Sequence, residues 1–263
     1  MAAFDPLQTL APLLGLWCRG AVRVHFHLPK PLHGWRQFVG EVGIIVVGVL
    51  IALSAEQLVE TMHWHHAVDA ARDSLSDEIE EKDYDAAELA IAQPCIDRQL
   101  QLLEQAVLAP GPYQPVPAYS EGAMTFAFRA PSRPWSNHIW QSVNNDGTVA
   151  HFDPKFRLGL ARLYGLLDSM RADNAVADTL RWRLAALTRP IQPDAAARAG
   201  IVTDIEQARG VYAIMALVAD QIIGNGEGVG FRPKAEDLRA DGSGTLNFCR
   251  AHRLPLGKVQ PKS

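Results

Sequence analysis

Hydrophobic and polar residues are unevenly distributed along the chain, and the sharpest contrast lies near its N-terminus. Residues 42–55, VGIIVVGVLIALSA, form an uncharged run dominated by Val, Ile and Leu. A helix of this run alone would measure about 21 Å, which is short of a hydrocarbon core of about 30 Å. Extending it to residues 38–59 gives about 33 Å and leaves Glu41 and Glu56 near the two interfaces. The pattern predicts a transmembrane helix over residues 38–59, with the lipid bilayer as its partner.

The alternative interpretation of this run is a buried or interfacial helix of a soluble protein. The nine Val, Ile and Leu residues of the run favour insertion by roughly 3 to 5 kcal/mol on the translocon scale. A glutamate at an interface costs far less than the roughly 2.5 to 3.5 kcal/mol of a charge at mid-membrane. We therefore expect insertion.

Helical patterning continues beyond the apolar run. Residues 58–108 contain no glycine and a single proline, Pro94, so one or two long helices are expected there. Residues 107–122 contain four prolines and predict an irregular connection.

Further helices are predicted in the second half of the chain. Asp153 and Pro154 should begin a helix that Pro190 ends. A last long helix is expected over residues 194–223, ended by the Gly224-Asn225-Gly226 run, with a loop-rich remainder. The predicted fold class is therefore all-α. The transmembrane helix continues as a long helix and is joined by a helical bundle with a proline-rich connection.

The charges that flank the span predict its orientation. Four cations precede it with no acid among them: Arg19, Arg23, Lys30 and Arg36. The first cation after it is Arg72, in an acid-rich segment. By the positive-inside rule, residues 1–37 are a cytoplasmic tail and residues 60–263 an extracytoplasmic domain. The predicted location is a bacterial inner membrane, with the domain in the periplasm.

The three cysteines are divided between the two predicted compartments. Cys18 falls on the reducing side and should be a free thiol, whereas Cys95 and Cys249 are the only two on the oxidising side. A disulfide between them is predicted. It would close a loop of about 155 residues, worth on the order of 5 kcal/mol at most. Two buried free thiols are the alternative.

Composition and motifs exclude several functions. A net charge of −4 provides no basic field for nucleic acid, so no nucleic-acid partner is expected. The acidic run at residues 73–85 lacks the glycine-centred loop of a calcium site and is predicted to be a solvated helix face. The glycine-rich residues 224–230 follow a helix rather than a strand and do not form a phosphate loop. No catalytic residue, metal ligand or cofactor is assigned.

Histidines provide the rival hypothesis, a membrane-tethered enzyme or metal-binding protein. Four of them are the candidates: His63, His66, His138 and His151. His63 and His66 would share a helix face, but no Cys or acid completes a recognised ligand spacing beside them. A polar collar next to the membrane is the simpler interpretation of the histidines around Trp64.

One face of the transmembrane helix collects small and acidic residues: Glu41, Gly48, Ala52, Ala55 and Glu56. The spacing of Gly48 and Ala52 allows close approach of helix backbones in membranes. We predict association of this helix with a second copy or with an envelope protein. Native sizing of wild type against Gly48→Leu tests it, and an unchanged size would count against the hypothesis.

Three segments together resemble a family of uncharacterised bacterial single-pass membrane proteins, of the domain-of-unknown-function kind. They are EVGIIVVGVLIALSAEQLVE at 41–60, PCIDRQLQLLE at 94–104 and WQSVNNDGTVAHFDPKFRLGLARLYGLL at 140–167. Four residues occupy the positions of the family pattern: Trp140, Gly147, Leu163 and Tyr164. The resemblance covers most of residues 35–190. It implies a short cytoplasmic tail, one glutamate-flanked span and a helical outer domain, without an activity.

The function expected from the sequence is a non-enzymatic interaction, sensory or scaffold role at the cell envelope. A third hypothesis, a soluble helical protein whose apolar segment is core, is separated from it by membrane extraction.

Overall fold

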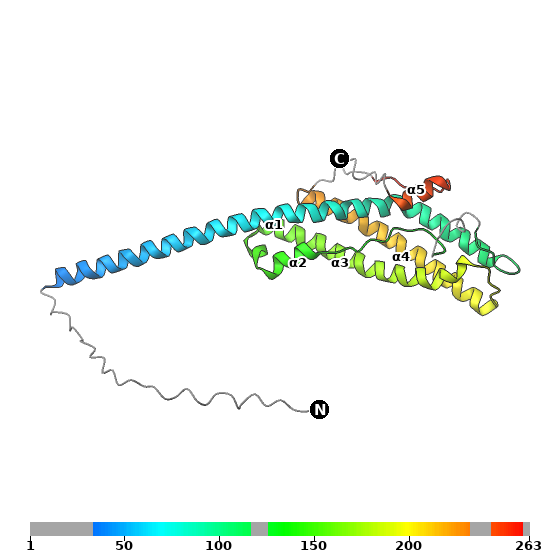
Figure 1. Ribbon diagram of the computed structural model, residues 1–263, viewed down its shortest axis with the longest axis horizontal. Coiled ribbons are helices and arrows are strands. Elements are labelled where there is room, and N and C mark those ends of the chain that lie inside the picture. The colour runs from blue at the N-terminus through cyan, green and yellow to red at the C-terminus, as the bar shows by residue number, and fades with distance from the viewer. Residues whose placement is uncertain (1–33, 117–125, 232–242, 260–263) are drawn as a thin grey trace, which may run out of the picture. The chain divides into compact units, whose positions relative to one another are not determined.

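The computed structural model describes residues 34–116, 126–231 and 243–259, and these residues are mostly helical (Figure 1). The elements follow in the order α1 (Trp35–Leu108), α2 (His138–Asn145), η2 (Thr148–His151), α3 (Pro154–Arg183), η3 (Leu184–Thr188), α4 (Ala195–Gly228) and α5 (Gly244–Ala251). Within the described ranges no β-strand occurs, and Tyr113 and Ile191 form an isolated antiparallel bridge. The all-α prediction is confirmed.

Contacts divide the chain into two units, residues 1–57 and residues 58–263. The described part of the first unit, residues 34–57, belongs to α1, and all its side chains are exposed. This helix is long and apolar enough to cross a membrane, and its most apolar window is not buried at all. A Cβ added at Gly48 would meet no atom within 4 Å, so the packing face of the transmembrane helix stays a prediction. Cys18 lies outside the described residues.

The core of the second unit is built from residues 58–108 of α1 together with α3 and α4, which run beside one another in Figure 1. Each helix contributes a buried apolar stripe, among them Leu75, Ile79, Ile96 and Leu100 of α1, Leu160, Leu163 and Leu167 of α3, and Ile205, Ala208 and Met215 of α4. Burying one such large aliphatic side chain favours folding by about 1.5 to 3 kcal/mol. The helical spacing seen in the sequence thus corresponds to one common core.

Pro94 lies inside α1, which is one helix rather than two. A proline in a helix removes one backbone donor and disturbs the carbonyl four residues earlier. The C-terminal segment approaches the helix here, because the amide of Gly257 donates to the carbonyl of Ile91 at 2.8 Å. A Cβ at Gly257 would lie 2.9 Å from the carbonyl oxygen of Ala90, so this close approach requires glycine.

The predicted start of α3 is confirmed. The Asp153 carboxylate accepts from the backbone N–H groups of Lys155 and Phe156 at 2.9 and 3.2 Å, and Pro154 occupies the first turn. Such a cap stabilises a helix by about 1 kcal/mol. After Arg183 the chain continues as η3 and leaves helical structure before Pro190.

The predicted end of α4 was wrong, because the helix continues through Gly224 and Gly226 to Gly228. Gly226 is buried, and a Cβ there would lie 3.1 Å from a carboxylate oxygen of Asp83 on α1. This glycine therefore allows two helices to approach closely instead of ending one. The loop-rich prediction for the C-terminal part also missed α5, whose eight residues are capped by Ser243.

Candidate functional site

Acidic side chains of α1 lie inside the second unit, which corrects the predicted solvated face at residues 73–85. Glu78, Asp83, Asp85 and Glu88 are all buried, and Lys82 among them is 1% exposed. Only some acids of the run, such as Asp77 and Glu80, face solvent. A buried carboxyl group must be hydrogen-bonded, paired or neutral. The three situations occur here at different positions.

Glu78 is the hydrogen-bonded case. Its carboxylate accepts from the hydroxyl of Tyr164 at 2.6 Å and from the backbone N–H groups of Ile139 and Trp140 at 3.0 and 3.4 Å. Burial and the contact with Glu78 raise the pKa of Tyr164. The side chain of Asn137, the residue before α2, makes no capping hydrogen bond. The Glu78 carboxylate of α1 instead satisfies the first backbone N–H groups of α2.

Two of the four residues of the family-like pattern, Trp140 and Tyr164, take part in this contact. Trp140 stacks on Tyr164, with ring centroids 4.8 Å apart and an angle of 4° between the planes. Leu163 is buried in the core. Gly147 precedes η2 with φ of +83°, a left-handed conformation that favours glycine. The pattern therefore describes how α2 and η2 are fixed to α1 and α3.

Replacing Tyr164 by Phe is expected to lower the free energy of unfolding by about 1.5 to 3 kcal/mol, because one hydrogen bond to a buried carboxylate is lost. Denaturant unfolding followed by tryptophan fluorescence, to which the buried Trp135 contributes, measures the change. Tyr84→Phe is the matched control, since the structure shows no hydrogen bond from its hydroxyl to a described residue. It should change stability by less than about 0.5 kcal/mol. Equal effects of the two variants would contradict the role of Glu78.

Asp83 is the neutral case. Its side chain is 1% exposed, and its Oδ1 has no hydrogen-bond partner among the described residues. Burial, together with the charges of Glu227 and Glu80, raises the pKa of Asp83 to about 8. The carboxyl group is therefore protonated in the folded protein at neutral pH, packed against Gly226 of α4.

Asp85 and Glu88 are the paired case, and Arg133 is their partner. The Nε of Arg133 lies 2.8 Å from Glu88 and 3.1 Å from Asp85. Burial raises the pKa of Asp85 to about 6, although the charges of Arg133 and Lys82 oppose the shift. Burial disfavours the charged form of Arg133 and by itself would lower its pKa. The contacts with Glu88 and Asp85 outweigh burial, so the pKa of Arg133 is raised. Ser243 donates its hydroxyl to Glu88 and caps α5 with the same oxygen.

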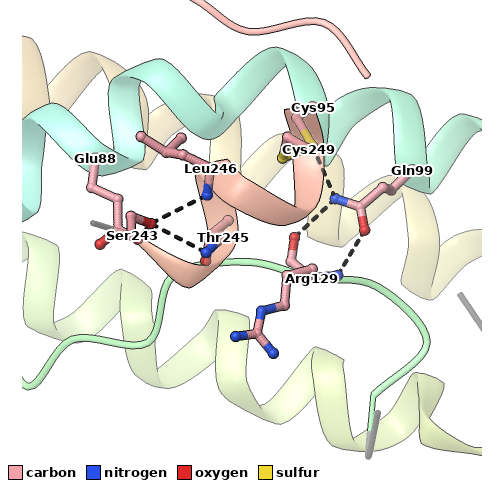
Figure 2. The surroundings of a disulfide bond; sticks show 8 residues. All are labelled: Glu88, Cys95, Gln99, Arg129, Ser243, Thr245, Leu246 and Cys249. Carbon is pink, nitrogen blue, oxygen red and sulfur yellow. Dashed lines mark hydrogen bonds between the residues drawn. A yellow bond between two sulfur atoms is a disulfide. The ribbon is translucent and has the colours of Figure 1, made fainter. Parts of the chain in front are cut away.

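The predicted disulfide between Cys95 of α1 and Cys249 of α5 is present, and both residues are fully buried (Figure 2). One turn further along α1, Gln99 pairs with the backbone of Arg129 in both directions. Its amide donates to the carbonyl at 2.9 Å and accepts from the N–H at 2.7 Å. Figure 2 shows the guanidinium of Arg129 pointing away from α1. The disulfide, Gln99 and Glu88 thus fix α5 and the segment around Arg129 to one helix.

These contacts border a cavity of about 370 Å³. Its walls are Phe126, residues 128–133, Glu88 of α1, Arg181 of α3 and the first residues of α5, Gly244 and Thr245. The cavity therefore has three arginines, one carboxylate and two phenylalanines on its walls. Sequence reasoning did not find it, because its residues come from four separate segments and no spacing pattern connects them.

The four histidine candidates do not form one cluster, and two of them contact Trp64. His151 stacks on Trp64 with ring centroids 3.8 Å apart, and His63 contacts the same indole edge-on. His66 and His138 are exposed. Across residues 34–116, 126–231 and 243–259, no group of three or more His, Cys, Asp or Glu side chains is placed to hold a metal ion. A comparison of the chain with protein-family models, curated proteins and solved structures found no match.

Proposed function

We propose that this chain is a single-pass membrane protein of the bacterial inner membrane. Its helical outer domain serves an interaction, sensory or scaffold role at the envelope, without enzymatic activity. The observation that carries this proposal is the uniformly exposed apolar surface of α1 over residues 38–59. An apolar surface of this length is not stable in water, and lipid is the environment that its composition fits.

The disulfide and the flanking charges support the orientation. A structural disulfide typically forms in an oxidising compartment, and Cys95 and Cys249 both lie after the span. The four cations before the span favour a cytoplasmic N-terminus. Both observations agree with an outer domain in the periplasm. The resemblance to single-pass proteins of unknown function agrees with the same topology.

The use of the buried charges supports an interaction role rather than catalysis. Glu78 is held by Tyr164 and α2, and Glu88 is held by Arg133 and Ser243. Both carboxylates are thus engaged in holding elements of the fold together. The partner would be a second copy or an envelope protein, through the small-residue face of the transmembrane helix.

Extraction of membranes with alkaline carbonate tests the proposal. The full chain should stay in the membrane pellet, whereas a chain lacking residues 38–59 should be released. Release of the full chain by carbonate would favour a soluble protein whose apolar segment is covered by protein.

A further inference from the structure

The arginine-lined cavity of the second unit contains one guanidinium with which no carboxylate of the described residues pairs. Arg133 is paired with Glu88 and Asp85, and Arg181 lies 3.2 Å from Asp178. Arg129 has no hydrogen-bond or ion-pair partner for its guanidinium among the described residues. Arg129 is thus the one arginine of the cavity wall that has no carboxylate partner among the described residues.

Arg181 adds a buried donor to the same wall. Its side chain is 8% exposed, and its Nε has no acceptor within the part of the chain that the structure describes. An unpaired buried donor costs about 1 to 3 kcal/mol. The ring of Phe126 covers the guanidinium at 4.3 Å and fixes its position. A fixed guanidinium loses little freedom when it binds an anion.

The helix α5 contributes to the same charge preference. Gly244 and Thr245, its first two residues, line the cavity, and a helix N-terminus carries a partial positive charge. A Cβ at Gly244 would lie 3.0 Å from an Nη atom of Arg129. The free guanidinium and the helix end are therefore next to each other.

The remaining walls define the rest of the ligand. Phe126, Phe128 and Pro131 provide apolar surface beside the cations. The volume of about 370 Å³ lies at the lower end of the range of roughly 300 to 1,000 Å³ for small-molecule sites. The unpaired guanidinium of Arg129 suits one negative charge, and an apolar wall suits a hydrocarbon body.

We propose that this cavity binds a small organic monocarboxylate, with its acid group between Arg129 and Arg181 and its apolar part against Phe126 and Pro131. A guanidinium binds a carboxylate through two parallel hydrogen bonds. This proposal goes beyond the membrane-anchored interaction role and does not depend on the orientation of the chain in a membrane. It would make the outer domain a sensor of organic acids.

Titration calorimetry of the full-length protein in non-ionic detergent tests the proposal, at constant ionic strength and at pH 7. The probes are benzoate and hexanoate, each compared with its neutral amide, and inorganic phosphate. At least one acid should bind ten times more tightly than its amide and than phosphate. The proposal is overturned if neither acid does so, and tighter binding of phosphate would assign the cavity to phosphate instead.

Variants separate this cavity from other binding surfaces. Arg129→Gln should weaken acid binding at least tenfold without changing the unfolding temperature, because its exposed guanidinium has no hydrogen-bond or ion-pair partner among the described residues. Arg157→Gln removes the same charge from an exposed position on α3 outside the cavity, and it should bind as wild type. The site would be refuted if Arg129→Gln bound the acid as tightly as wild type. It would also be refuted if both variants lost the same acid affinity. Membrane extraction of the same proteins tests the anchor separately.

Discussion

Replacing both Cys95 and Cys249 by serine is expected to lower the free energy of unfolding of residues 58–263 by about 3 to 5 kcal/mol. The disulfide joins residues 154 positions apart, and a cross-link over such a long loop restricts the unfolded chain most strongly. It also attaches α5, whose eight residues could not hold a helix by themselves. Urea unfolding of the full-length protein in detergent, followed by tryptophan fluorescence, measures the loss.

Cys18→Ser is the matched control, because it is the same substitution at the one cysteine outside the disulfide. It should leave the free energy of unfolding unchanged within about 0.5 kcal/mol. Reduction of the wild-type protein should reproduce the double serine variant. If neither reduction nor the double variant shifts the transition, α5 does not depend on the disulfide.

Replacing Asp83 by Asn is expected to stabilise the protein at pH 8 by roughly 3 kcal/mol more than at pH 5. The folded-state pKa of about 8 lies above the ordinary value of 3.8. Between these two values the unfolded chain gives up a proton that the folded chain retains. The wild-type protein therefore loses stability as pH rises from about 4 to 8, at about 1.4 kcal/mol per pH unit at most. Asparagine mimics the protonated carboxyl group at every pH.

Denaturant unfolding of wild type and Asp83→Asn at pH 5 and pH 8 measures this difference. The contribution of Asp85, whose pKa is also raised, cancels because it is present in both proteins. Asp77→Asn, at an exposed position of the same helix, should show no such change between the two pH values. An equal effect of Asp83→Asn at both pH values would show that this carboxyl group ionises normally.

Much of the fold follows from local sequence patterns. The Asp153-Pro154 start of α3, the long helical structure after the apolar run and the Cys95–Cys249 disulfide were predicted, because each depends on nearby residues or on a count of cysteines. That Pro94 does not divide this structure into two helices was left open by the sequence. The end of α4 and the existence of α5 were not. Gly226 resembles a helix stop until Asp83 is known to lie beside it.

The candidate site was less accessible to prediction. The acids at 78, 83 and 85 look like a solvated face, because what lies beside them comes from distant segments: Tyr164 beside Glu78, Gly226 beside Asp83 and Arg133 beside Asp85. Hydropathy assigns charged residues to the surface, and only the tertiary structure shows which of them are paired. The cavity depends on the same long-range contacts, so it too could only be found in the folded chain.

Paired topology reporters test the central proposal of a membrane-anchored outer domain most directly. Alkaline phosphatase and green fluorescent protein are each fused after Ser263 in a bacterial host, with the full chain and with a chain lacking residues 38–59. We expect phosphatase activity that requires residues 38–59 and no fluorescence from the full chain. Fluorescence without phosphatase activity would contradict the proposed orientation and place residues 60–263 in the cytoplasm.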